Sequence, residues 1–159
     1  MPQVVFSVDA ASINCFVASL DSVFETMLDL PVKRQGLEFK SGSLAGDGVA
    51  TLIGISGPAT GVVVLRYPSA TAIALAAKMS GSQPDSVDET VTDVVCELAN
   101  MVAGAAKAKI EGDTPAELSL PSIIVGSNYN LHYPSKAVWV DMPFTSDAGD
   151  FTFQLSFNP

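Results

Sequence analysis

The spacing of apolar residues along the chain first indicates three helices. Between positions 13 and 28 the apolar residues recur at intervals of three and four, which is the pattern of an amphipathic helix. Ser86 with Glu89 three residues later forms a capping box, which opens the longest helix. A residue that stops helices follows each stretch. The first predicted helix opens after Asp9 or Ser12, runs to about Leu30 and is ended by Pro31; the others are 69–79, ended by Gly81, and 87–111, ended by Gly112.

The rest of the chain favours strands. Residues 62–65 form a continuous apolar run, as in a strand that is buried on both faces. In the last strand Phe and Leu alternate with Thr, Gln and Ser, which predicts one buried and one wet face. The predicted strands are 36–41, 49–56, 61–67, 119–126, 130–133, 137–144 and 150–157, with turns at Gly46-Asp47-Gly48, Gly57-Pro58, Asn128, Pro134 and 147–149.

This order of elements predicts the fold class. Runs of adjacent strands after single helices favour an α+β fold, in which an antiparallel sheet of about six strands packs with three helices on one side. With 159 residues the chain suits one domain, 1–159. The first helix also repeats part of the third, because Asp21 and Glu25 have the spacing of Asp93 and Glu97. We therefore expect a weak internal two-fold repeat.

Charge and composition exclude several classes of partner. The formal net charge is −9, and the eight Lys and Arg residues form no run, so nucleic acid is not an expected partner. No apolar run reaches membrane-spanning length and no signal peptide is recognisable, so we expect no membrane and a cytoplasmic location. Cys15 and Cys96 lack metal-ligand spacing and are expected to remain thiols. The low charged fraction, 16%, favours a partner or oligomer surface.

Self-contained catalysis is not expected from these residues. The chain has one histidine, His132, in an aromatic strand-like stretch, where a partly buried structural role outweighs that of a general base. Cysteine and histidine do not recur at ligand spacing, so no metal site is predicted. The glycines at 46 and 48 lack the lysine and the following helix of a phosphate-binding loop.

One polar stripe remains, in the middle of the third helix. At 100° per residue, Asp93, Glu97, Asn100 and Gly104 fall on one face, opposite a stripe of apolar residues. An acid and an amide three residues apart are most often surface residues. Here the neighbouring positions are small, which either packs the helix closely or leaves room for another molecule to approach it.

The run Asp93-x-x-x-Glu97-x-x-Asn100-x-x-Ala103-Gly104, followed by the segment 118–123 (Leu-Ser-Leu-Pro-Ser-Ile), resembles the signature of the CheC, CheX and FliY phosphatases of bacterial chemotaxis. The resemblance extends over most of the chain and is closest to the CheX branch, whose members carry one active motif. Leu28 stands in the first helix where a second motif would place its amide, which fits the single-site pattern.

The resemblance implies a phosphatase that accelerates hydrolysis of the aspartyl phosphate of a CheY-like response regulator. Asn100 would orient the attacking water and Glu97 would pair with a lysine of the regulator. Asp93 and Gly104 would belong to the docking surface. The chain itself would bind no cofactor, since Mg²⁺ would belong to the regulator, and the protein would form a homodimer through its sheets.

Two other interpretations of the polar stripe remain open from the sequence alone. The chain could be a module of the same fold that binds a response regulator or a flagellar switch component without useful turnover. It could also be a structural dimerisation domain, in which Glu97 and Asn100 are merely solvated. The residues do not name the regulator, nor do they distinguish chemotaxis from another two-component pathway.

Overall fold

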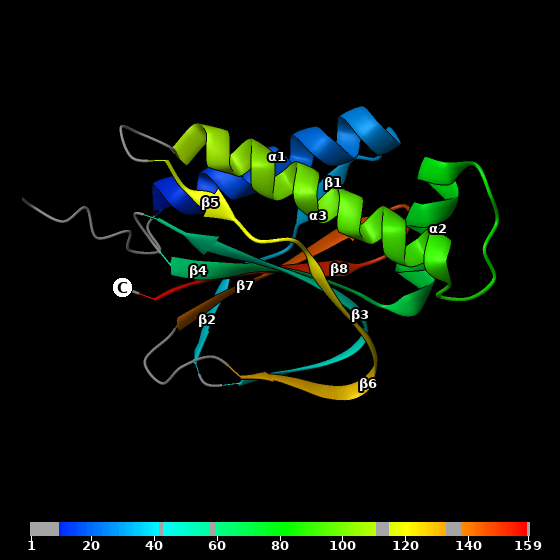
Figure 1. Ribbon diagram of the computed structural model, residues 1–159. Coiled ribbons are helices and arrows are strands. Elements are labelled where there is room, and N and C mark those ends of the chain that lie inside the picture. Colours follow the sequence, from blue (N-terminus) through cyan, green and yellow to red (C-terminus); the bar gives the residue numbers. More distant parts are fainter. Residues whose placement is uncertain (1–9, 42, 58–59, 111–114, 133–137, 159) are drawn as a thin grey trace, which may run out of the picture.

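The computed structural model describes residues 10–41, 43–57, 60–110, 115–132 and 138–158. Three helices lie on one face of an antiparallel sheet (Figure 1). The elements are α1 (Ala10–Leu28), β1 (Val32–Arg34), β2 (Glu38–Ser41), β3 (Ser43–Ser56), β4 (Thr60–Tyr67), α2 (Ser69–Ser80), α3 (Glu89–Ile110), β5 (Glu117–Leu118), β6 (Ser122–His132), β7 (Val138–Ser146) and β8 (Phe151–Asn158). The predicted α+β class with three helices is confirmed, and the sheet has eight strands, two of them very short.

The main core lies between the helices and the sheet. Large aromatic side chains from β7 and β8 meet those of α1 there, and Phe151 stacks on both Phe24 and Phe144. Every apolar residue at the centre of this layer is buried. The continuous apolar run in β4 is buried along its length, as the sequence predicts, because helices cover one face and a second apolar cluster covers the other.

The sheet has the internal two-fold symmetry that the repeated spacing suggests. Its strand order is β1-β7-β8-β4-β3-β5, and in addition β2 pairs with β7 and β6 pairs with β3. Exchanging β1 with β5, β2 with β6, β3 with β7 and β4 with β8 leaves every one of these pairings unchanged. The antiparallel pair β4 and β8 lies at the centre of this exchange. Helices α1 and α3 pack against each other and take equivalent places in the two halves (Figure 1).

The helix ends differ in detail from the prediction. Helix α1 stops at Leu28 because Asp29 takes a left-handed conformation, with φ of 48°, before Pro31 is reached. Helix α3 is capped by Asp88, whose Oδ1 accepts a hydrogen bond of 3.1 Å from the Val91 N–H. The predicted capping box at Ser86 is therefore wrong. Helix α2 ends at a left-handed Gly81 as expected, and Gly112 lies outside the described residues.

Two of the predicted turns are instead one β-bulge. Strand β3 continues through Gly46-Asp47-Gly48, and β6 continues through Asn128, so both turn predictions are wrong. The register shifts between Gly46 and Gly48, and Asn128 has a φ of 54°. The Asn128 N–H donates a hydrogen bond of 2.8 Å to Asp47 Oδ1. Residues that tolerate positive φ suit a bulge as well as a turn, which explains the error.

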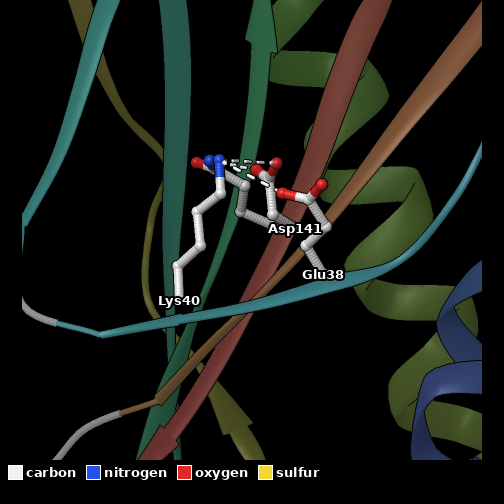
Figure 2. A network of polar contacts seen from close by, with 4 residues as sticks. Glu38, Lys40 and Asp141 are labelled. Atoms are coloured by element: carbon white, nitrogen blue, oxygen red, sulfur yellow. Dashed lines mark hydrogen bonds and ion pairs between the residues drawn. The ribbon is translucent and has the colours of Figure 1, made fainter.

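The predicted wet face of β8 is also wrong. Gln154 and Ser156 are fully buried, because β2, β6 and the first part of β3 curl over the side of the sheet that faces away from the helices (Figure 1). Gln154 Nε2 donates a hydrogen bond of 2.6 Å to Asp141 Oδ1. Asp141 in turn pairs with Lys40 at 3.4 Å, beside Glu38 (Figure 2). A hydrogen bond thus pairs the Gln154 amide nitrogen, although the alternation alone assigns this side chain to water, whereas the buried Gln154 Oε1 has no hydrogen-bond partner among the described residues.

Candidate functional site

Helix α3 presents the predicted polar stripe to solvent. Asp93, Glu97 and Asn100 are exposed and Gly104 is half-buried. The opposite face of the helix is fully buried and includes Leu98. Because that apolar face is locked into the core, the exposed side chains project from a rigid support. The helix places the four predicted site residues on one face, as their spacing requires.

Gly104 leaves an opening at one end of the stripe. A Cβ atom built at this position would meet no atom within 4 Å, so no neighbouring side chain of this protein requires a glycine there. Glycine costs about 1 kcal/mol relative to alanine in the middle of a helix. A helix that accepts this cost without an internal packing reason has its surface open to the close approach of another molecule.

Neither the Glu97 nor the Asn100 side chain makes a hydrogen bond or ion pair with another residue in the described part of the chain. Their side chains are neighbours, because residues three apart on a helix have Cβ atoms about 5–6 Å apart. Asp93 lies one turn before Glu97 and adds a second carboxylate to the same edge. The stripe therefore combines an acidic edge with one amide, and none of its four residues is a histidine, serine or cysteine.

The equivalent face of α1 differs at one position. Asp21 and Glu25 are exposed there, as Asp93 and Glu97 are on α3. Leu28, which corresponds to Asn100 in the repeated spacing, is only 5% exposed and belongs to the main core. Burial raises the pKa of Asp21, the neighbouring Glu25 raises it further, and Arg34 opposes the shift. The α1 face thus keeps the acids but offers no amide.

The thiol beside the stripe is a weak nucleophile. Burial, and then the nearby Asp93 carboxylate, raise the pKa of Cys96. Burial also raises the pKa of the enclosed Tyr67, with Cys96 as its second cause. Cys96 and Cys15 are both free thiols, as the sequence predicts.

Other candidate chemistry is absent from the described residues. His132 is exposed on β6, so its predicted partly buried setting is wrong: the β6 edge lies open at this point. No group of three or more His, Cys, Asp or Glu side chains in the described ranges could hold a metal ion. Among the described helices, none has the length and apolarity that crossing a membrane would need.

The loop between β5 and β6 belongs to the segment 118–123, for which the sequence predicts no functional role of individual residues. Leu120 in this loop is the most exposed of the large apolar side chains of the described residues. Ser119 fixes the loop to β3 through hydrogen bonds with Gly54. An exposed leucine between two turn-forming residues gives no periodic signal, so only the structure identifies it.

A separate pocket of about 460 Å³ opens at the β-bulge, away from the stripe. Arg66 and Asp47 provide its charged groups, and the first residues of α2 form one wall. None of the four predicted site residues contributes to it. Its complete lining is Gly46, Asp47, Gly48, Arg66, Tyr67, Pro68, Ser69 and Thr152.

Comparison with known proteins gives consistent matches over most of the chain. The family described as chemotaxis phosphatase CheX matches residues 49–145, a span that contains all of α3. The CheY-P phosphatase CheX of Thermotoga maritima is 28% identical over 158 residues, which cover 93% of this chain and 96% of that protein.

Solved structures share the fold as well. A CheC-like superfamily protein from Shewanella sp. PV-4 superposes with a TM-score of 0.84 at 31% identity, covering 95% of this chain and 99% of that one. A chain in the crystal structure of the CheX-CheY-BeF3-Mg²⁺ complex from Borrelia burgdorferi superposes with a TM-score of 0.72. It is 21% identical, with 96% of this chain and 100% of that chain covered. At this identity the likeness shows the fold alone.

Proposed function

This chain belongs to the chemotaxis phosphatase CheX family, and from that premise we propose that it accelerates hydrolysis of the aspartyl phosphate of a CheY-like response regulator. The observation that carries the proposal is the exposed acid and amide pair on α3, whose members have no partner among the described residues. The name of the Thermotoga relative, CheY-P phosphatase, supports the substrate. The Borrelia complex, which contains CheX and CheY, supports the kind of partner.

Asn100 would position the attacking water. An aspartyl phosphate is already labile, so the main task of the phosphatase is to place a water in line with the phosphorus atom. An amide suits this task because its oxygen accepts and its nitrogen donates a hydrogen bond, and neither changes charge near neutral pH. The rigid support of α3 would hold that amide in register. Asn100 would act only once the regulator supplies the phosphoryl group.

Glu97 would anchor the helix to a lysine of the regulator. An exposed carboxylate gains little from an ion pair in water, but the same pair gains more when docking excludes solvent. Asp93 would extend the acidic edge, and Gly104 would let the partner surface come close. Mg²⁺ would be held by the regulator, where it neutralises charge on the phosphoryl oxygens. The net charge of −9 favours approach to a positively charged feature of the partner.

The direct test is release of phosphate from CheY-like regulators that carry label on their aspartate. Wild-type protein is expected to accelerate the loss, and Asn100→Ala is expected to lower kcat by about 100-fold. Asn14→Ala is the matched control, because Asn14 is an exposed asparagine on the equivalent helix α1. An Asn100→Ala protein that stays folded and keeps full activity would remove the catalytic role of this residue.

The alternative is a binding module without useful turnover. It is favoured only if the protein binds a phosphorylated regulator and no member of a regulator panel loses its label faster. The chain would then use the same face of α3 for docking. Glu97→Lys would weaken that complex even though no catalysis is measured.

The homodimer also belongs to the proposal. Strand β6 has eleven residues, and among the described strands it pairs with β3 alone, so its other edge carries a long row of backbone groups that no described strand pairs with. Such an edge could extend the sheet into a second copy. Sedimentation of wild-type protein is expected to give a dimer, and a monomer over the micromolar range would remove this part of the proposal.

The free thiols Cys15 and Cys96 suit the reducing cytoplasm, where the regulator would be met.

A further inference from the structure

The loop after β5 is held to the sheet by the backbone and side chain of one residue, Ser119. The Ser119 N–H donates a hydrogen bond of 2.9 Å to the Gly54 carbonyl oxygen, and the Gly54 N–H donates one of 2.8 Å to Ser119 Oγ. The Ser119 hydroxyl in turn donates to the Leu120 carbonyl oxygen at 3.0 Å. Because these hydrogen bonds already order the loop backbone around Ser119, the loop would lose little conformational entropy on binding.

This fixed loop presents an apolar side chain to water. Leu120 is 88% exposed, whereas the other large apolar residues on the described surface are between 42% and 64% exposed. Burying a leucine side chain away from water is favourable. A single exposed leucine is ordinary on a protein surface. Leu120 differs from a leucine on a flexible loop because its backbone is already ordered. A partner could therefore bury the Leu120 side chain at a low cost in conformational entropy.

The two-fold symmetry supplies an internal comparison for this loop. The Gln35 N–H after β1 donates to the Pro143 carbonyl oxygen at 2.8 Å, in the position that Ser119 and Gly54 occupy in the second half. The next residue is Gly36 in the first half and Leu120 in the second. The exposed leucine is therefore present only in the half that carries the exposed amide.

The loop lies beside α3. Leu118 and Ile123, the apolar residues on its two sides, pack against the core to which α3 contributes its buried face. Helix α3 also contacts the strand that follows the loop, β6. In Figure 1 the segment from β5 to β6 passes below the middle of α3. A partner that covers the α3 stripe would reach this loop as well.

We propose that Leu120 is an apolar docking contact for the response regulator, held in place by Ser119, and that it sets the affinity for the partner rather than the rate of the chemical step. This inference rests on the proposed function of the α3 stripe. The stripe provides charge and an amide, which orient a partner but bury little apolar surface. Leu120 adds the apolar contact at the margin of the same face, and its occupant is an uncharged patch next to the regulator's phosphorylation site.

The test separates binding from turnover. Leu120→Ala and Leu120→Asp are measured for KM and kcat in phosphate release, and for Kd against a regulator loaded with BeF3 and Mg²⁺. We expect both KM and Kd to rise about tenfold for Leu120→Ala, which corresponds to about 1.4 kcal/mol, and further for Leu120→Asp, with kcat within twofold. Leu120→Met is expected to restore most of the affinity. Met27→Ala, which removes an exposed apolar side chain from α1, is the matched control and should change neither constant.

Ser119→Ala tests the positioning role. Loss of the hydroxyl removes the bond from Gly54 and the bond to the Leu120 carbonyl, so KM should rise a fewfold although Leu120 is retained. Unchanged KM and Kd in both Leu120 variants would overturn the inference, as would a fall in kcat with KM unchanged. Either result leaves the proposed function intact so long as wild-type protein accelerates release and Asn100→Ala does not. A wild-type protein that neither binds nor accelerates any regulator would overturn both.

Discussion

Helices α1 and α3 occupy equivalent places in a two-fold fold, pack against each other, and carry the same pair of acids at the same spacing. They differ one turn after the second acid. Asn100 is exposed on α3, whereas Leu28 is buried at the end of α1. The acidic edge is therefore shared by both halves, and the exposed amide is confined to one.

The surroundings of the two faces follow the same division. On the α1 face, Arg34 lies close enough to oppose the rise in the pKa of Asp21, and its positive charge partly offsets the negative charge of the two acids. The α3 face has no such cation in the corresponding strand, where β5 consists of Glu117 and Leu118. A partner that recognises a carboxylate edge and needs an amide would thus find both requirements only at α3. Five experiments test this difference between the two helices.

Leu28→Asn should have the largest effect, and on stability. The substitution removes a buried leucine, for which truncation costs about 2–5 kcal/mol, and it leaves an amide in an apolar site. We expect the free energy of unfolding to fall by about 4 kcal/mol in urea titration, without any gain in phosphatase activity. Leu28→Met, which conserves volume, is the control. A stable Leu28→Asn protein with higher turnover would mean that α1 can become a second site.

Asn100→Leu copies the α1 residue onto α3. The side chain is exposed, so stability should change by less than about 0.5 kcal/mol. Turnover should fall by about 100-fold, which is about 2.7 kcal/mol of transition-state stabilisation. Single-turnover phosphate release measures this effect, and Asn14→Leu on α1 is the matched control. Equal losses in the two variants would show that the change acts through the surface in general.

Glu97→Lys and Glu25→Lys compare the acids themselves. Reversal of charge at Glu97 should raise KM about tenfold, because a lysine of the partner would face another cation at close range. Glu25→Lys should leave KM unchanged. The difference should shrink as ionic strength rises, since salt screens exposed charges. If the two variants behave alike at low salt, the acids do not distinguish the two faces.

Gly104→Ala is expected to raise the stability of the protein and to weaken docking of the partner. Nothing lies within 4 Å of the new methyl group, so the helix should gain about 1 kcal/mol in thermal or urea unfolding. If a partner approaches this point, kcat/KM should fall a fewfold despite the gain. A protein that is stabilised and fully active would place Gly104 outside the docking surface.

Asp21→Asn should have the smallest effect, and it depends on pH. The folded-state pKa of Asp21 lies above the model-peptide value of 3.8, so the folded protein holds this proton more tightly than the unfolded chain. Wild-type stability therefore falls as pH rises from below 3.8 through the raised pKa. Asp21→Asn should stabilise the protein by a few tenths of a kcal/mol at pH 7, because the group is largely solvent-screened, and not at pH 3. An equal effect at both pH values would contradict the shift.

The fold could be predicted from the sequence wherever a pattern has a single physical meaning. Helix α2 lies between Pro68 and a left-handed Gly81, and few other structures accommodate that pair. Residues that tolerate positive φ are ambiguous, so the sequence predicts two turns, at Asp47 and at Asn128, although these residues meet in one bulge. Burial by distant segments leaves no local signal. Gln154 therefore looked wet although strands far away in sequence cover it.

The part of the candidate site that lies on helix α3 could be predicted from the sequence. Asp93, Glu97 and Asn100 share a face because helical periodicity places them there, and the structure confirms that the face is exposed. The loop at Leu120 could not be predicted, because its position relative to α3 depends on the pairing of β5 with β3. The roles of Asn100, Glu97, Asp93 and Gly104 stay predictions until the variants are measured.

The central pair of strands also bears on how the chain folds. Strands β4 and β8 join residues that are almost a hundred positions apart, such as Thr60 and Asn158, and each strand comes from a different half. Such distant pairing closes a long loop before it gains any contact, so it slows folding. During synthesis β4 is complete long before its partner exists. We therefore expect the first half to depend on the second for a stable sheet and to expose an apolar strand to aggregation until β8 has been made.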